Sequence, residues 1–331
     1  MSVDTPEELE GLRRAGALAA EVLREVREAV APGVSTAELD ALAADRMRAA
    51  GAHSAPIVTY GFPGAICISV GDQVVHGIPG PRRLVAGDLV KLDVSLELDG
   101  YFADTATTVA VEPESSSDAR LVAATRAALR RGMRAAVAGA TVRDVGETVE
   151  RIAEARGFSV LRDLTGHGIG RALHEPPTVP NFADPKLGDR LHEGLVMTIE
   201  PMLAAGTRKI LGTGDGWTVI TADGSHAAHE EHTIVVTAGE PIVLTAASTA
   251  SAPGIAASRW LGCRPSASAG RSPGDCATTS GCADSGAAWS SPAACATSAS
   301  RARATACTAR SPTSPRTTCA SPDGSTPTRA W

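Results

Sequence analysis

Apolar residues recur every three or four positions along residues 7–30, and this period predicts an amphipathic helix. Thr5, Pro6 and Glu8 precede the pattern as an N-cap, a proline at the first helical position and a glutamate at the third, which is the order of a capping box. A second helix is predicted to begin at Ser35 and to end near Gly51. The buried stripe of the first helix comprises Leu12, Ala15, Leu18, Ala19, Val22 and Val26.

The second half of the chain repeats this plan. Residues 33–51 align with residues 139–157 without a gap, with Ser35 matching Thr141 and Glu38 matching Asp144. A long helical pattern precedes each copy, and strand-like sequence follows it. We interpret this as two similar α/β halves packed as one domain. The alternative is a chance likeness between two capped amphipathic helices.

Residues 90–106 alternate between apolar and polar side chains, and Asp99-Gly100 in their middle predicts a type I′ hairpin turn. This turn places Ser95 opposite Asp104, and Asp93 shares a face with Ser95 because strands have a period of two. Asp93 and Asp104 are therefore expected to be diagonal neighbours, with Cβ atoms roughly 5–8 Å apart. That separation suits two carboxylates that hold a pair of metal ions. On the hairpin alone, a solvent-facing acidic surface is the simpler interpretation.

Three further polar residues in the second half favour a metal site over a solvent-facing acidic surface. His167 lies in the glycine-rich segment TGHGIG, where we expect a turn that lets backbone approach a ligand closely. Glu200 ends an apolar run before Pro201, and Glu231 precedes another apolar run. Four carboxylates and one imidazole form a hard donor set that suits Mn²⁺, Fe²⁺ or Co²⁺. The nearby HEEH segment (229–232) is not a zinc-peptidase helix motif, because its histidines are three positions apart and a β-branched run follows it.

Composition divides the 331-residue chain into two parts. The chain is 43% hydrophobic and 21% charged with a net charge of −6, as expected of a soluble globular protein. After about residue 248 the sequence is dominated by Ala, Ser, Thr, Pro, Gly and Arg, and it contains no Val, Phe or Lys. We predict a globular domain over 1–248 and a disordered, low-complexity tail over 249–331. The tail is either a genuine disordered extension or the product of an out-of-frame or read-through C-terminus.

The cellular compartment is predicted from the absence of membrane-spanning and signal-peptide patterns. It has no run of about 20 apolar residues that could span a membrane, and its charged N-terminus has no signal-peptide core. Six of the seven cysteines fall in the tail, in spacings that match no zinc motif, and Cys67 alone lies in the globular part. We therefore expect a cytoplasmic protein in a reducing compartment.

Five motifs taken in order resemble the type I methionine aminopeptidases over residues 5–245: VVHGIP (74–79), DVSLELDGYFADT (93–105), TGHGIGRALHEPP (165–177), TIEPM (198–202) and EEHTIVVT (230–237). The resemblance implies the pita-bread fold, an α/β (α+β) architecture with two pseudo-symmetric halves around a curved antiparallel sheet. It also implies a site for two divalent metal ions, which could be Co, Mn, Fe or Zn. The implied ligands are Asp93, Asp104, His167, Glu200 and Glu231. The short interval from His174 to Glu200 lacks the insertion of type II enzymes, and the short N-terminus lacks a zinc-finger extension.

The resemblance further implies a reaction and its partners. The substrates would be the N-termini of nascent polypeptides, met at the ribosome, with the initiator Met removed when the second residue is small. Glu200 would accept a proton from the attacking water, His174 would donate to the developing oxyanion, and His76 would position the scissile amide. We expect no specific nucleic acid, no membrane contact and a monomer.

The pocket for the first side chain is implied to involve Phe62, Cys67, Met202 and Trp217. This sequence departs from the family at Pro56, Thr59, Leu173 and Glu230, and these departures leave the shape of the pocket open. Two other hypotheses remain. One is a related pita-bread peptidase directed at Xaa-Pro bonds, and the other is a binding member of the fold without catalysis. Loss of a ligand would mark the second of these, and all five ligand positions are present.

Overall fold

A computed structural model describes residues 1–246 of the chain. The predicted tail over 249–331 and the predicted domain boundary at residue 248 lie outside these residues. The helices are α1 (Pro6–Glu28), α2 (Thr36–Ala49), α3 (Ala55–Tyr60), α4 (Ser116–Ala135) and α5 (Val142–Glu154). The strands of the first half are β1 (His53–Ser54), β2 (Cys67–Val70), β3 (Gln73–Val75), β4 (Leu89–Leu98) and β5 (Tyr101–Ala110). Those of the second half are β6 (Ser159–Val160), β7 (Thr165–Gly168), β8 (Glu175–Pro180), β9 (Val196–Ile199), β10 (Met202–Ala204), β11 (Ile210–Gly212), β12 (Val219–Thr221), β13 (Ala227–His229), β14 (His232–Val235) and β15 (Ile242–Val243).

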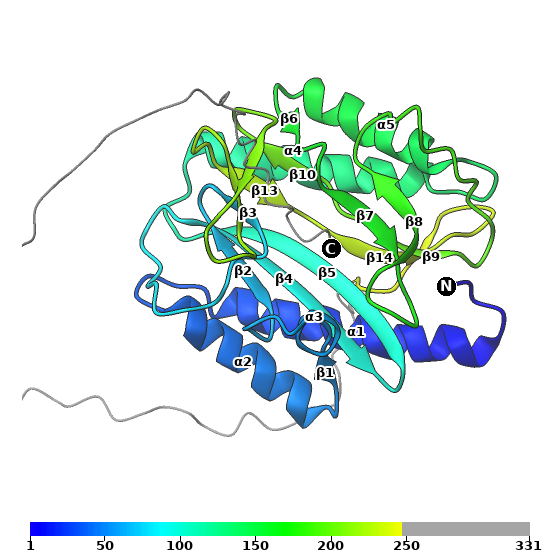
Figure 1. The fold of residues 1–331 in the computed structure, drawn as a ribbon, viewed down its shortest axis with the longest axis horizontal. Helices are drawn as coiled ribbons and strands as arrows, with labels where there is room; N and C mark the ends of the chain where they lie inside the picture. The colour runs from blue at the N-terminus through cyan, green and yellow to red at the C-terminus, as the bar shows by residue number, and fades with distance from the viewer. Residues whose placement is uncertain (247–331) are drawn as a thin grey trace, which may run out of the picture. The chain divides into compact units, whose positions relative to one another are not determined.

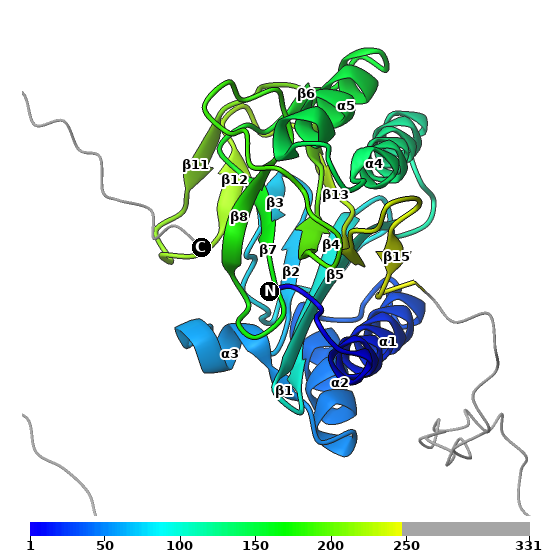
Figure 2. The ribbon, with the colours of Figure 1, turned by 90° about the vertical axis from the view of Figure 1, so that its right-hand side faces the viewer.

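Helices α1 and α2 cover the strands of the first half, and α4 and α5 cover those of the second (Figures 1 and 2). Along β4, Val90, Leu92, Val94 and Leu96 are fully buried in the cluster that packs against α1 and α2. Because side chains alternate across a strand, Asp93 and Ser95 lie on the opposite face of β4. The helices therefore supply the core, and the other face of the strand layer is left for the polar residues.

Each half contains an equivalent hydrogen bond at the start of the predicted repeat. The Gly33 N–H donates to the Leu84 carbonyl and the Gly139 N–H to the Leu191 carbonyl, each at 2.8 Å. Both glycines have a positive φ, which explains why glycine begins each copy. Ser35 and Thr141 then cap α2 and α5, each in a capping box closed by the acidic residue at the third helical position. The correspondence thus extends beyond helix patterning to the segments that pack on each helix start.

The predicted capping box at the first helix is half wrong. Thr5 is the N-cap of α1 and its hydroxyl accepts from the Glu8 N–H, as expected. The Glu8 carboxylate, however, accepts from the Asp4 N–H at 2.9 Å rather than from the N-cap residue. The chain enters α1 with Asp4 closer to this carboxylate, so the reciprocal bond forms one residue earlier.

All strand pairs within the described residues are antiparallel, and the strands form four hydrogen-bonded sheets. Strands β1, β2, β4 and β5 form one sheet, and β15-β14-β9-β7-β8 form the largest sheet of the second half. Threonine hydroxyls join the halves where β5 meets the segment from β13 to β14. Thr105 Oγ1 donates to the Glu231 carbonyl at 3.0 Å, and Thr233 Oγ1 donates to the Asp104 carbonyl at 2.7 Å. The predicted α/β class with two similar halves and antiparallel strands is confirmed. None of the helices within residues 1–246 is long and apolar enough to cross a membrane.

Gly168 offers a direct test of how closely β7 and β8 approach each other. A Cβ added at this glycine would lie 2.1 Å from the Pro176 carbonyl oxygen, a contact with backbone that cannot rotate away. We expect Gly168→Ala to lower the free energy of unfolding by roughly 1–3 kcal/mol, since overpacking forces the two strands apart. Urea denaturation measures this loss. Gly188→Ala is the matched control because a Cβ there meets open space, and equal stability of the two variants would contradict the packing described.

Candidate functional site

The hairpin of β4 and β5 has the predicted turn and the predicted register. Asp99 and Gly100 have φ values of +54° and +80°, as a type I′ turn requires. Ser95 pairs with Asp104 and Asp93 with Ala106, so the two aspartates are diagonal neighbours on one face. Ser95 Oγ donates to Asp104 Oδ1 at 2.7 Å. The solvent-facing alternative is wrong, because Asp104 is only 6% exposed and Oδ1 of Asp93 is buried.

His167 lies within β7, and the prediction that it occupies a turn is wrong. The glycines beside it permit close packing instead: a Cβ at Gly166 would lie 2.9 Å from the Thr198 carbonyl oxygen. His167 Nδ1 is 2.9 Å from the Gly168 carbonyl oxygen, and this oxygen can accept only from a protonated Nδ1. The bond therefore leaves Nε2 with a lone pair for a metal ion.

Glu200 and Glu231 lie where the sequence places them, at the end of β9 and at the start of β14. His167 Nε2 is 3.5 Å from Glu200 Oε1 and 4.0 Å from Asp104 Oδ2. Ligand atoms of Asp104, His167 and Glu231 all lie within 4.8 Å of one another. Carboxylates from both halves thus meet the His167 imidazole on the face opposite the helices.

Burial and mutual repulsion shift the pKa values of these groups so that the uncharged form of each is favoured. Burial first, and then the charge of Asp104, raises the pKa of Asp93 well above its usual range. Burial also raises the pKa of Glu200 and Glu231 well above theirs, and burial lowers the pKa of His167 to about 4. Ionised carboxylates this close together are stable only beside a cation, whereas a neutral imidazole is the form that binds a metal.

Unpaired buried atoms identify where a cation fits. Within residues 1–246, Asp93 Oδ1 and Glu231 Oε1 are buried without a hydrogen-bond partner. Buried polar atoms without partners are costly, and a metal ion provides the missing interaction. Because the donors are oxygens and one imidazole nitrogen, the set fits a hard or borderline divalent ion.

Comparison with known proteins agrees with this geometry. The family model "Metallopeptidase family M24" matches residues 10–238. The chain belongs to this family. It is 44% identical over 245 residues to methionine aminopeptidase 1 of Mycobacterium tuberculosis, covering 72% of this chain and 92% of that protein. It is 40% identical over 238 residues to the methionine aminopeptidase of Clostridium perfringens, covering 72% of this chain and 96% of that protein. The resemblance to type I methionine aminopeptidases is confirmed, and like these M24 relatives the chain is a metallopeptidase.

Solved structures give the same result for the fold. The methionine aminopeptidase of Rickettsia prowazekii superposes with a TM-score of 0.72 at 38% identity, covering 74% of this chain and all of that one. The prolidase of Pyrococcus horikoshii superposes with a TM-score of 0.60 at 21% identity, covering 74% of this chain and 64% of the prolidase. The second similarity is one of fold alone. The pita-bread architecture predicted from the sequence is therefore confirmed.

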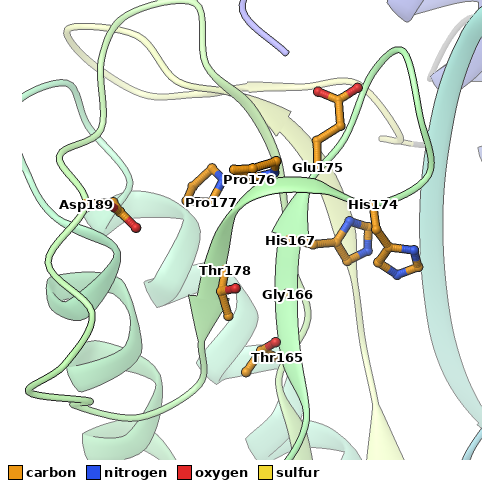
Figure 3. A pocket seen from close by; sticks show the side chains of 9 residues that line it. All are labelled: Thr165, Gly166, His167, His174, Glu175, Pro176, Pro177, Thr178 and Asp189. Carbon is orange, nitrogen blue, oxygen red and sulfur yellow. The ribbon is translucent and has the colours of Figure 1, made fainter. Parts of the chain in front are cut away.

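His76 and His174 lie close enough to influence each other. Burial lowers the pKa of His76 to about 3, and electrostatic repulsion from His174 adds to this effect. Burial also lowers the pKa of His174 to about 3, and electrostatic repulsion from His167 adds to this effect. The rings of His167 and His174 have centroids 4.0 Å apart (Figure 3). His76 also has a φ of +57°, an unusual backbone conformation for a non-glycine residue and one found often at functional sites.

The predicted pocket residues are only partly brought together. Phe62 and Trp217 pack edge to face with centroids 5.3 Å apart. Cys67 pairs with Asp93 across β2 and β4, and Met202 packs in a different cluster, with Val75 and Val219. A separate hollow of 380 Å³ lies along β7 and β8 and reaches the site at His167 and His174 (Figure 3). Whether Phe62, Cys67, Met202 and Trp217 bind a substrate side chain stays a prediction.

The unusual Glu230 has a structural explanation. Its carboxylate accepts from Arg126 Nε of α4 at 3.0 Å, and it bonds to the Thr107 hydroxyl and the Thr108 N–H as well. Glu230 is 6% exposed, so these three donors compensate for its burial. Of the other departures, Leu173 and Pro56 are buried and Thr59 is exposed. Glu230 therefore attaches the segment before Glu231 to α4 and β5.

Sequence reasoning missed two residues at this site, His229 and Tyr60. His229 is 2% exposed, and its Nε2 lies 3.8 Å from Glu200 Oε2 and 3.9 Å from Glu231 Oε2. His229 ends β13 and lies two positions before Glu231, within the HEEH segment that matches no zinc-peptidase motif. Tyr60 bonds to His174, as described below, and no sequence signal identified it.

His229 leads to a prediction about pH. Burial lowers its pKa to about 3, whereas the unfolded value is about 6.5. The unfolded chain therefore takes up a proton first as the pH falls, and the stability contributed by neutral His229 is lost below pH 6.5. Between pH 7 and 5 we expect the metal-free wild type to lose about 2 kcal/mol more stability than His229→Gln.

Urea denaturation of the metal-free chain at the two pH values measures this difference. The two proteins differ only at position 229, so the difference between their pH dependences reports the effect of His229 together with its effect on neighbouring groups. The exposed His53 provides the control, and His53→Gln should keep the wild-type pH dependence. A His229→Gln variant with an unchanged pH dependence would contradict the burial of a neutral imidazole.

Proposed function

We propose that this chain removes the N-terminal methionine from polypeptides whose second residue is small, using two divalent metal ions. The observation that carries the proposal is the convergence of Asp104, His167 and Glu231 donor atoms within 4.8 Å of one another. Asp93 and Glu200 complete the proposed ligand set. The relatives above, named methionine aminopeptidases, support the choice of substrate.

The chemistry follows from the residues around this set. When bound, two divalent ions lower the pKa of a water molecule so that hydroxide is available near neutral pH. Glu200 would accept the proton that the attacking water loses. Thr198 Oγ1 donates to Glu200 Oε1 at 2.7 Å and holds the carboxylate in place. His174 donates an N–H to the oxyanion of the scissile carbonyl, and His76 positions the amide. Both are uncharged imidazoles near neutral pH and so have one N–H each.

Phe62, Cys67, Met202 and Trp217 are proposed to receive the methionine side chain. Phe62, Cys67 and Met202 are each less than 5% exposed, and their apolar, sulfur-containing surface suits a thioether. The carboxylate of Asp40 accepts from the N–H groups of Ala65 and Ile66 at 2.7 and 3.0 Å. It thereby fastens the loop that carries Phe62 to α2.

The remaining proposals concern the protein's setting. We propose that residues 1–248 form the catalytic unit, and the family match over 10–238 supports this. We further propose that it acts as a cytoplasmic monomer on nascent chains at the ribosome.

A peptide panel tests the proposal. The purified full chain is assayed with Mn²⁺, Fe²⁺ or Co²⁺ on Met-Ala-Ser, Met-Leu-Ser and Ala-Pro-Ser, and again with EDTA. The expected result is metal-dependent release of methionine from Met-Ala-Ser, slower release from Met-Leu-Ser and none with EDTA. Preference for Ala-Pro-Ser would indicate an Xaa-Pro peptidase instead, and binding without hydrolysis would indicate a non-catalytic member. Either result overturns the proposal.

A further inference from the structure

Tyr60 is the last residue of the short helix α3, and both ends of this helix are fixed. Ser54 caps the start of α3 and its hydroxyl donates to the Ala65 carbonyl at 2.7 Å. Gly61 ends the helix in the left-handed region, with φ at +70°. These constraints hold the Tyr60 side chain at a defined place beside the second half of the molecule.

The Tyr60 hydroxyl reaches His174 directly. Tyr60 Oη lies 2.7 Å from His174 Nδ1, and the two rings are 5.6 Å apart at an angle of 53°. The contact joins residues 114 positions apart, one in each half. It is a short hydrogen bond to a ring nitrogen of the residue assigned above as the oxyanion donor.

The chemistry of the two groups gives this bond a direction. Neutral imidazole has one N–H and one acceptor nitrogen. A phenol is a good donor but a poor acceptor, since its oxygen lone pair is delocalised into the ring, whereas an unprotonated imidazole nitrogen is a strong acceptor. The favoured arrangement therefore has Tyr60 O–H donating to Nδ1, and the proton of His174 is then on Nε2. Burial keeps both groups uncharged near neutral pH, because it raises the pKa of Tyr60 and lowers that of His174.

We propose that Tyr60 is a positioning residue that holds His174 in its Nε2–H tautomer, so that Nε2–H is directed at the oxygen of the scissile carbonyl. The role of His174 rests on the proposed function, whereas the tautomer is a property of the folded chain by itself. Without the Tyr60 hydroxyl, His174 would exchange between two tautomers, and only one of them can donate from Nε2. A purely structural Tyr60 would stabilise α3 without affecting the imidazole proton.

Tyr60→Phe tests this directly, since it removes one oxygen and keeps the ring. In the metal-loaded full chain we expect kcat to fall at least about tenfold, less than for complete loss of an oxyanion donor, while KM changes by less than about threefold. Tyr101→Phe makes the same chemical change away from the site, where the hydroxyl bonds to Arg171 at 3.0 Å, and should leave kcat unchanged. In a His174→Ala background, Tyr60→Phe should have no further effect, because a positioning residue acts only through its partner.

Nitrogen NMR of ¹⁵N-histidine-labelled chain reads the tautomer without relying on activity. The His174 signals are assigned by their loss in His174→Ala, with Zn²⁺ bound and again with EDTA. We expect a protonated Nε2 and an unprotonated Nδ1 in the wild type, and an averaged pair of signals in Tyr60→Phe. A protonated Nδ1 in the wild type, or a Tyr60→Phe variant with unchanged kcat, would overturn the inference. If the wild type releases no methionine while the NMR result holds, the proposed function fails and the tautomer assignment stands.

Discussion

Asp93→Asn is expected to abolish methionine release while the chain stays folded. Asparagine has the same size and keeps the pairing of β4 with β2 and β5, so the fold has no reason to change. The variant loses the charge that offsets a divalent ion. Because loss of an outer partner of a metal ligand already costs about 10–100-fold, loss of the ligand itself should cost at least about a hundredfold in kcat/KM.

The same substitution has a second expected effect, on stability. Burial and Asp104 raise the pKa of Asp93 in the metal-free chain, so an ionised Asp93 opposes folding there. The metal-free variant should therefore melt at the wild-type temperature or above it. Added Mn²⁺ should raise the melting temperature of the wild type much more than that of the variant, since an ion that binds the folded state stabilises it.

Asp99→Asn is the matched control for both measurements. Asp99 is an exposed acid in the turn of the same hairpin, and asparagine before glycine also favours a type I′ turn. It should keep full activity and the full stabilisation by metal. Full activity and unchanged metal binding in Asp93→Asn would instead refute the assigned site.

Glu200→Gln is expected to lower kcat by about 10²–10⁴-fold, the range for loss of a general base. Glutamine keeps the size of the side chain and an oxygen that can accept from the Thr198 hydroxyl, but it cannot accept a proton. The kinetics should be measured at saturating Mn²⁺, so that weaker metal binding is not mistaken for lost catalysis.

The pH profile separates the role of Glu200 as a general base from its role as a metal ligand. In the wild type, kcat should rise with pH as the base loses its proton, and this limb should be missing from Glu200→Gln. Glu193→Gln changes an exposed glutamate of the same half and should leave the profile intact. A Glu200→Gln variant that retains most of the wild-type kcat would assign the base elsewhere.

Much of the metal site could be predicted because local rules place it. The Asp99-Gly100 turn fixes the register of one hairpin, and a two-residue period then determines that Asp93 and Asp104 share a face. Glu200 and Glu231 are also placed locally, since Glu200 directly follows one short apolar strand and Glu231 directly precedes another. Such contacts depend on neighbouring residues and are accessible to pattern reasoning.

The parts that could not be predicted depend on packing between distant segments. His167 lies in a strand because Gly166 and Gly168 let two neighbouring strands approach, and the sequence TGHG by itself suggests a turn. His229 lies beside Glu200 because β13 pairs with β10, which places His229 opposite Met202. Tyr60 meets His174 because α3 shares a hydrophobic cluster with Ile169 and Leu173 of the other half. No periodicity in the sequence states which of these surfaces face each other.

Anomalous diffraction from crystals of the full chain grown with Mn²⁺ tests the central claim most directly, because it locates the ions themselves. We expect two peaks, each bounded by carboxylates, with ligands drawn from Asp93 and Asp104 of one half and from His167, Glu200 and Glu231 of the other. A single peak, or peaks away from these five residues, would contradict the account.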